Sequence, residues 1–488
     1  MASIEWACKE LYTTGDPAVR VQAEKTCTGI CERPDCIATC KSLLERGDSC
    51  YSQFIAASTL TKYISNRDTV VHVGLRLQLR NFALNYLATR PGLESIVQQA
   101  LIALICRLTK IGWFDSAEDG PEYPFRDIFE SVKNFIQSGQ ISAILVGVKL
   151  LSSLVTEICQ STETDLARAT FFVRKLLVSF RDLVLFSIFQ MGLDLLRQTD
   201  ANLKSLTAID QDQLQVIQHT LALVLACLNY DFVGTAIGCA GDNGSGSPCT
   251  SDDMASVQLP AAWRPIFLDA NNVDLFFRLF AGLPQSPTSP NLRILITSIR
   301  RTLFTNDERQ NFLSPLMVGC LEVLRRRDSL LCDPTVYHEF CRLLSRMKIT
   351  FQVGELMQVS VYPEFIKLVA DLTTHSLYKI EARSVVAPQN LNDSPDFSNS
   401  NSLHYLLALW QRLVASIPYV RLSQPYLIDT YAPQVTRAYI ESRLARVPSY
   451  TESGSKVKLV RPVKKSSASG AGVDKSGNQY SLDLTPGT

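Results

Sequence analysis

Two stretches near the start of the chain first indicate its fold: Arg20-Val-Gln-Ala-Glu-Lys25, and Ser49-Cys-Tyr-Ser-Gln-Phe-Ile-Ala-Ala57 with its continuation to Lys62-Tyr-Ile64. In the second stretch, Ile55, Thr59 and Tyr63 recur at four-residue spacing, and Ala56 and Leu60 lie beside them. This spacing predicts an amphipathic helix with one face against a neighbour. The small pair Ala56-Ala57 allows a partner helix to come close. We therefore expect two or three short helices packed on one another.

The same helical periodicity dominates the rest of the chain, and strand alternation is nearly absent. Apolar residues follow helical spacing from Leu75 to Tyr86 and again from Val97 to Leu108, and Arg90-Pro91 separates the two segments. Further helix-length units are expected at about 124–138, 141–160, 166–198, 209–228, 261–284, 290–304, 308–326, 334–348, 361–378, 402–416 and 431–446.

Paired helices in units of about 40 residues are typical of an alpha-solenoid. We therefore predict an all-α superhelix of HEAT-like helical hairpins with an armadillo-type architecture. The alternative is an irregular all-helical globule. We place the first repeats at 1–110 and further repeats at 111–446, with loops at 232–258 and 387–401. Ser/Gly/Lys-rich sequence at 447–488 predicts a disordered tail.

Composition and charge limit the possible partners. The longest apolar run, Leu221–Leu228, is much shorter than the roughly 20 residues that a membrane span needs. Met1–Trp6 lacks the basic and apolar regions of a secretory signal, so we expect a soluble intracellular chain without membrane insertion. The net charge of +1 argues against direct nucleic-acid binding. The segment from Tyr450 onward carries a net charge of +3, which leaves the body at −2.

The fourteen cysteines fit a reducing compartment, where thiols serve as small buried hydrophobes. Five of them gather near the start, at Cys27, Cys31, Cys36, Cys40 and Cys50. Their i, i+4 pairs make a four-thiolate zinc site conceivable, but no tight C-x2-C turn or nearby histidine accompanies them. We favour buried thiols on adjacent helices and expect no metal or other cofactor.

The chain has no recognisable catalytic motif. It lacks a Walker-type loop, a Gly-x-Ser-x-Gly elbow and a His-Glu-x-x-His pair. Its histidines are dispersed, and His338 and His404 are interpreted as structural residues on helices. We therefore predict no enzyme activity and no catalytic residue, and we expect recognition by a large curved scaffold.

Several blocks of the chain resemble, in order, the importin-beta superfamily of transport receptors, and within it the exportin-7 branch with its Ran-binding paralogue. The blocks are Asn81–Pro91, Thr109–Asp115, Ser179–Asp182, Cys227–Thr235, Trp263–Asp269, Arg300–Arg309, Asp333–Leu344 and His404–Leu413. The first-turn pattern Gln22-Ala-Glu24 and the pair Ala56-Ala57 resemble the superfamily's N-terminal module, at about 23–89 here.

This resemblance implies a nuclear export receptor that shuttles between nucleus and cytoplasm. Its partners would be the small GTPase Ran in its GTP form, protein cargo and nucleoporins, with Ran and cargo strengthening each other's binding. The principal Ran-binding surface would lie in the first repeats, although no individual Ran-contact residue can be transferred. The alternative is a HEAT-repeat scaffold that holds cytoplasmic complexes together without transport.

The chain also departs from the pattern of this branch. Its members continue with many more repeats, whereas here the match ends at Ala445-Arg-Val-Pro448. The resemblance therefore implies a truncated isoform or a gene-model fragment. Such a chain would lack much of the cargo surface and would leave the apolar face of its last repeat uncovered.

Overall fold

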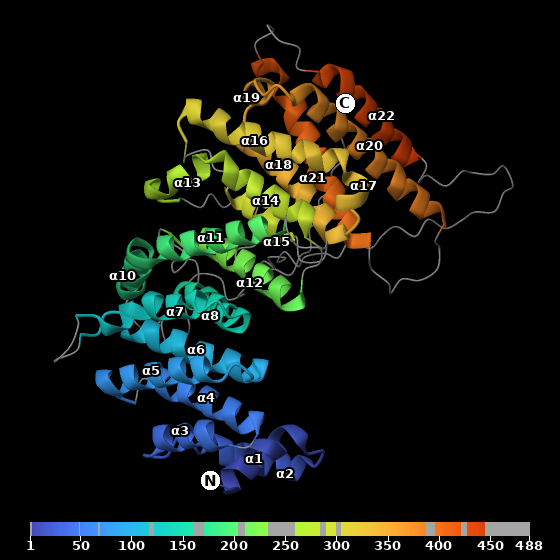
Figure 1. Ribbon diagram of the computed structural model, residues 1–488. Coiled ribbons are helices and arrows are strands. Elements are labelled where there is room, and N and C mark those ends of the chain that lie inside the picture. Colours follow the sequence, from blue (N-terminus) through green and yellow to red (C-terminus); the bar gives the residue numbers. More distant parts are fainter. Residues whose placement is uncertain are drawn as a thin grey trace, which may run out of the picture.

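A computed structural model describes residues 2–47, 49–66, 69–116, 122–160, 170–203, 210–232, 259–283, 289–298, 304–386, 396–420 and 427–444. Within these ranges the chain is helical and contains no strand. The helices stack as successive hairpins, with the N-terminus at one end of the stack and the last helix at the other (Figure 1). The prediction of an all-α solenoid of helical hairpins is confirmed.

The first half of the stack runs from α1 to α12. Its elements are α1 (Ala2–Thr13), α2 (Pro17–Thr28), α3 (Cys36–Arg46), α4 (Cys50–Ser65), α5 (Val73–Thr89), α6 (Ser95–Gly112), η1 (Pro124–Asp127), α7 (Ile128–Gln137), α8 (Ile141–Cys159), α10 (Thr170–Phe180), η2 (Arg181–Leu185), α11 (Phe186–Leu203) and α12 (Gln211–Leu228). The segment η2 is a π-helical turn that joins α10 to α11 without a break.

The second half runs from η4 to α22. Its elements are η4 (Ala261–Trp263), α13 (Arg264–Leu268), α14 (Ala270–Gly282), α15 (Ser289–Ser298), α16 (Asn306–Arg325), α17 (Arg327–Leu330), α18 (Pro334–Thr350), α19 (Val353–Met357), α20 (Tyr362–Val386), α21 (Asp396–Ala415), η5 (Ile417–Tyr419) and α22 (Ile428–Leu444).

Local sequence signals explain where several helices begin. Asp16 precedes α2 and its carboxylate accepts a hydrogen bond from the amide of Ala18, while Pro17 occupies the first helical position. Asp333 and Pro334 start α18 in the same way. The hydroxyl of Ser49 accepts a hydrogen bond from the amide of Ser52 at the start of α4. These caps satisfy amides that have no partner within their own helix.

The helices form two layers. The layer that we call the inner layer contains α4, α6, α8, α12, α15, α18 and α21, each packed on the next. The outer layer contains α3, α5, α7, α11, α14, α16, α20 and α22. From α11 onward the successive outer helices also pack on one another, whereas α3, α5 and α7 pack chiefly on their own hairpin partners. Because successive helices lie closer together on the concave side of a curved double layer, we take the continuous layer as the inner one.

Hydrogen bonds and ion pairs tie several hairpins to the next, and five of these ties have similar separations in sequence. Arg80 bonds Asp127, Arg107 bonds Glu157, Arg181 bonds the carbonyl of Phe232, and Arg293 and Arg309 bond Glu339 and Glu355. The two residues of each tie are 46 to 51 positions apart. This separation matches the repeat length expected for a HEAT-type array.

The helix boundaries agree closely with the predicted units, but two expectations were wrong. Residues 396–401, predicted as part of a loop, form the first turns of α21. Helix α20 extends to Val386, beyond the predicted end at 378. Residues 233–258, 387–395 and 447–488, where the remaining loops and the tail were predicted, lie outside the described residues.

The expectation that no apolar segment reaches membrane-spanning length was also wrong. By length and composition alone, three helical segments are long and apolar enough: Ser95–Gly112, Ile141–Cys159 and Phe171–Asn202. The apolar residues are spread along each helix instead of forming one run, which is why a search for uninterrupted runs missed them. In the most apolar 18-residue stretch of each segment, 67%, 44% and 50% is buried within the protein, because the helices pack against their neighbours. The absence of membrane insertion stays a prediction.

Candidate functional site

The N-terminal hairpins are built around α4, whose apolar stripe lies where the sequence predicted it. Ile55, Thr59 and Leu60 are buried, and Tyr63 is half-buried at the edge of the stripe. Ala56 and Ala57 have no exposed surface. Helix α4 packs between α3, α1 and α6, so its small residues lie in a tightly packed interior. The predicted packing role of this stretch is confirmed.

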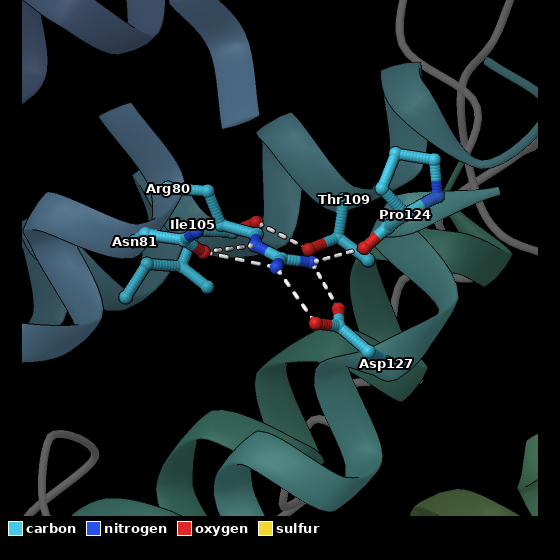
Figure 2. Close-up of polar contacts among 6 residues, drawn as sticks. All are labelled: Arg80, Asn81, Ile105, Thr109, Pro124 and Asp127. Atoms are coloured by element: carbon cyan, nitrogen blue, oxygen red, sulfur yellow. Dashed lines mark hydrogen bonds and ion pairs between the residues drawn. The ribbon is translucent and has the colours of Figure 1, made fainter. Parts of the chain in front are cut away.

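A buried arginine joins this region to the next hairpin. Arg80 of α5 is only 1% exposed, and its guanidinium lies between Asn81, Pro124 and Asp127 (Figure 2). Its Nη1 donates to Asp127 Oδ1 at 2.6 Å and to the Pro124 carbonyl at 3.2 Å. Its Nη2 donates to Asp127 Oδ2 at 3.2 Å and to Asn81 Oδ1 at 2.9 Å. This fork-shaped pairing fixes the position of α5 relative to η1.

A tyrosine ties α5 back to α3. The Tyr86 hydroxyl donates to the Leu44 carbonyl at 2.6 Å, and the guanidinium of Arg90 lies 4.1 Å from the centre of the Tyr86 ring. Burial raises the pKa of Tyr86, although Arg90 opposes the shift. The hydroxyl therefore stays protonated and available as a donor to the last turn of α3.

Two buried cations connect three helices of the inner layer. Arg107 of α6 donates from Nε to Ser65 Oγ at 3.0 Å and from Nη1 to Glu157 Oε1 at 3.1 Å, so it bridges α4 and α8. Lys110, one turn further along α6, donates to the Glu157 carbonyl at 2.7 Å. This carbonyl belongs to the last turn of α8, where the helix dipole favours a positive charge. The inner layer is thus held by charge as well as by apolar packing.

The solvent-facing side of the inner layer carries mostly polar or small residues near the N-terminus, together with the exposed Ile96 of α6. Its exposed residues include Lys62 of α4, Gln99 and Ala103 of α6, Thr156 of α8 and Ala222 of α12. Because each helix buries the faces that contact its neighbours, these residues mark the free surface of the layer. We name this set the inner surface. These residues include no arrangement of nucleophile and base.

The cysteines near the start are mostly buried, as predicted. Cys8, Cys27, Cys36 and Cys40 are buried, whereas Cys31 and Cys50 are half-buried. Among the residues that the structure describes, no group of three or more His, Cys, Asp or Glu side chains is arranged to hold a metal ion. The sequence had not singled out Cys8, whose sulfur lies 3.9 Å from that of Cys27.

Two histidines make structural contacts, whereas His404, interpreted from the sequence as a structural residue, is exposed on α21. His338 Nδ1 lies 3.2 Å from Ser402 Oγ, and its ring meets Tyr405 edge-on. His72 caps α5, because its Nδ1 accepts a hydrogen bond from the amide of Gly74 at 3.2 Å. The structural interpretation of His338 agrees with these contacts. The capping role of His72 was missed because histidine is not among the usual N-cap residues.

At the far end of the stack, α22 exposes Tyr439, Ile440 and Leu444. Tyr378 of α20, also exposed, donates its hydroxyl to Glu441 Oε2 at 2.7 Å. The exposed side chains of α22 lie on the last helix of the described part of the chain.

Comparison with known proteins finds relatives along nearly the whole length of this chain. Residues 23–89 match the importin-beta N-terminal domain. The chain is 43% identical over 449 residues to exportin-7-A of Xenopus laevis, 42% over 447 residues to Ran-binding protein 16 of Drosophila melanogaster and 39% over 449 residues to Ran-binding protein 17 of Homo sapiens. The chain is a homologue of the exportin-7 and Ran-binding protein 16/17 group. The predicted resemblance is confirmed.

The match covers a much larger share of this chain than of its relatives. The alignments cover 91–92% of this chain but only 38% of each of these relatives. The module predicted at about 23–89 coincides with the matched domain, which spans the end of α2, all of α3 and α4, and α5 to its last residue. The matched module therefore lies in the first hairpins of the stack; it includes Arg80, and Arg107 lies on the next helix, α6.

Proposed function

We propose that this chain takes part in nuclear export of protein cargo and binds Ran in its GTP form. The observation that carries the proposal is 39–43% identity, over 91–92% of the chain, to proteins named exportin-7 and Ran-binding protein. Names of this kind favour a transport receptor over the alternative, a scaffold without a transport role. They also describe receptors rather than enzymes, which fits the prediction that the chain has no enzyme activity.

We place Ran on the inner surface at the level of α4, α6 and α8. Support comes from the match of residues 23–89 to the importin-beta N-terminal domain, because α4 belongs to that domain and packs directly on α6. Arg107 links the three helices through Ser65 and Glu157, and these contacts limit the conformational entropy that the surface loses on binding.

Cargo, nucleoporins and shuttling between nucleus and cytoplasm are part of the same proposal. They rest on the homology to exportins, since the chain spans about 38% of the length of these relatives. A chain of this extent carries the proposed Ran surface and a share of the cargo surface. We propose that Ran and cargo strengthen each other's binding, so that hydrolysis of GTP releases both.

The test is binding of the purified chain to Ran loaded with GTP or GDP, measured by interferometry. We expect binding to the GTP form and at least tenfold weaker binding to the GDP form, a difference of about 1.4 kcal/mol or more. Equal binding to both forms, or no binding, would overturn the proposal and leave the scaffold alternative in place.

A matched pair of variants tests the location of the surface. Ala103 on α6 and Ala88 on α5 are both exposed, on the inner and outer helices of one hairpin. The Ala103→Arg variant places a long charged side chain on the inner surface and should weaken binding of GTP-loaded Ran by about tenfold. The Ala88→Arg variant adds the same side chain on the outer layer and should leave affinity unchanged. If Ala88→Arg weakens binding and Ala103→Arg does not, the inner surface is the wrong location.

A further inference from the structure

The first hairpin of the solenoid brings two thiols from different helices into contact. Cys8 lies on α1 and Cys27 on α2, and their sulfurs are 3.9 Å apart in the interior of the hairpin. Cys8 has no exposed surface, and Cys27 is 7% exposed. We propose that Cys8 and Cys27 form a reversible disulfide when the chain meets a hydroperoxide oxidant. This modification site does not depend on Ran binding.

The geometry separates this pair from the other close thiols. Cys36 and Cys40 are four residues apart on α3, and side chains at that spacing have Cβ atoms about 5–6 Å apart. A disulfide requires Cβ atoms about 3.5–4.5 Å apart, so a bridge within α3 would distort the helix. The sulfurs of Cys8 and Cys27 belong to two different helices and lie 3.9 Å apart, so a bond of about 2.05 Å between them does not have to span a turn within one helix.

The two thiols are also chemically unequal. The hydrogen bond between them lowers the pKa of Cys27 and raises that of Cys8. Cys27 is therefore the more acidic thiol of the pair, and the thiolate is the species that attacks an oxidant. Cys8, which lies against Cys27, is the thiol that then attacks the oxidised Cys27 sulfur.

The reaction balances in two steps. The Cys27 thiolate attacks one oxygen of the hydroperoxide, the O–O bond breaks, and Cys27 becomes a sulfenic acid while hydroxide or alkoxide leaves. Cys8 then loses its proton and attacks the Cys27 sulfur, which forms the S–S bond and releases water. Overall the two thiols lose two electrons and two protons, and the hydroperoxide is reduced to water and an alcohol or, from hydrogen peroxide, to two waters.

The position of the pair gives the bond a defined structural effect. Helix α1 is the first helix of the stack and packs on α2 and α4. Tyr12 of α1 stacks on Tyr51 of α4 with ring centres 5.1 Å apart and covers the same region. A bond between Cys8 and Cys27 would fasten α1 to α2 and close a loop between residues 19 positions apart. In a reducing compartment, where stable disulfides are rare, such a bond serves as a transient signal.

The experiment treats the whole purified chain with rising amounts of hydrogen peroxide, alkylates the remaining thiols after denaturation and maps disulfides by peptide mass spectrometry. We expect a peptide pair that joins Cys8 to Cys27, lighter by two hydrogens, and its loss after reduction with dithiothreitol. The exposed Cys332 reports whether the oxidant reached the protein. Oxidised Cys332 without a bond between Cys8 and Cys27, or a link from Cys8 to another cysteine, would overturn the proposal.

Variants and hydrogen exchange complete the test. Cys27→Ser and Cys8→Ala should each abolish the linked species, whereas Cys36→Ser should retain it. The mapping of the unaltered chain stays decisive if a variant folds poorly. Oxidation of the unaltered chain should slow amide exchange in α1 by several-fold, because α1 can then no longer separate from α2. If mass spectrometry shows the bond between Cys8 and Cys27 but amide exchange in α1 is unchanged, the bond does not fasten α1 to α2.

Discussion

The burial of the Arg80 guanidinium allows us to predict the cost of leaving its charge without a partner inside the solenoid. Its side chain is 1% exposed, whereas that of its carboxylate partner Asp127 is 55% exposed. The two variants Asp127→Asn and Arg80→Met therefore break the same pair in opposite ways. The first leaves a positive charge buried without its counter-charge, and the second leaves a carboxylate that water can solvate.

The structure sets the size of each effect. Breaking a fully buried ion pair costs about 3–5 kcal/mol, and an exposed pair contributes about 0–1 kcal/mol. Because Arg80 is buried and Asp127 is half-exposed, we expect Asp127→Asn to cost about 2 kcal/mol, between these two limits. Arg80→Met removes the charge but leaves the Pro124 carbonyl without this donor, which costs about 1 kcal/mol. The double variant should cost about 1 kcal/mol, well below the sum of the two.

Hydrogen exchange of the amides in α5 and α7 is the suitable assay, because a repeat protein opens locally as well as globally. A loss of about 2 kcal/mol corresponds to exchange about 30-fold faster in Asp127→Asn. Exchange in α20 and α22, at the other end of the stack, serves as the internal control. The reasoning is refuted if Arg80→Met costs more than Asp127→Asn, or if the two effects add.

Further predictions concern one histidine and one glycine. Burial, with a smaller effect of Lys149, lowers the pKa of His219 below its usual 6.5. The unfolded chain then binds more protons between the folded pKa and 6.5, so stability falls as pH drops through that window, and His219→Gln should reduce this loss in melting curves. A Cβ at Gly112 would lie 2.5 Å from Phe125 Cδ2, so Gly112→Ala should cost about 1–3 kcal/mol in urea unfolding. Gly354→Ala, where a Cβ meets no atom within 4 Å, is the control and should be neutral or stabilising by up to about 1 kcal/mol; equal losses at both glycines would contradict the packing argument.

Much of the fold follows from local signals that a single sequence carries. Helical periodicity predicted a unit at 334–348, and α18 spans Pro334–Thr350. The stripe of Ile55 and Leu60 predicted which face of α4 is buried. Such features depend on neighbours within a few residues along the chain, which is why they can be read without knowing the tertiary structure.

The ties between hairpins could not be predicted in the same way. Arg107 and Lys110 lie in an otherwise apolar helical stretch, and their partner Glu157 is 50 and 47 residues away. Charged residues inside an apolar run indicate buried ion pairs only after the partner helix is known. The end of α20 at Val386 was missed for a related reason, because polar residues continue that helix after its apolar pattern has faded.

The sequence predicted which segment contains the candidate site, but not which side chains form its exposed surface. The residues 23–89 identified the module, but which side of α4 and α6 faces solvent depends on how successive hairpins stack. Exposed positions such as Lys62 and Ala103 have no motif, because a surface that recognises a folded protein needs shape and charge rather than a fixed spacing. Only the arrangement of the inner layer brings these positions onto one face.

The unequal packing of the two layers suggests how a partner on the inner surface could act at a distance. In the first hairpins the inner helices α4, α6 and α8 pack on one another, whereas α3, α5 and α7 pack chiefly on their own partners. Bending about the inner layer therefore changes few apolar contacts in the outer layer there. From α11 onward both layers are continuous, so the same bend would have to disrupt packed helices. A partner that draws α4 and α8 together should then change the curvature of the first hairpins and leave the second half rigid. Small-angle scattering of the chain with and without GTP-loaded Ran, combined with hydrogen exchange, measures this difference; protection that changes equally along the whole stack would refute it.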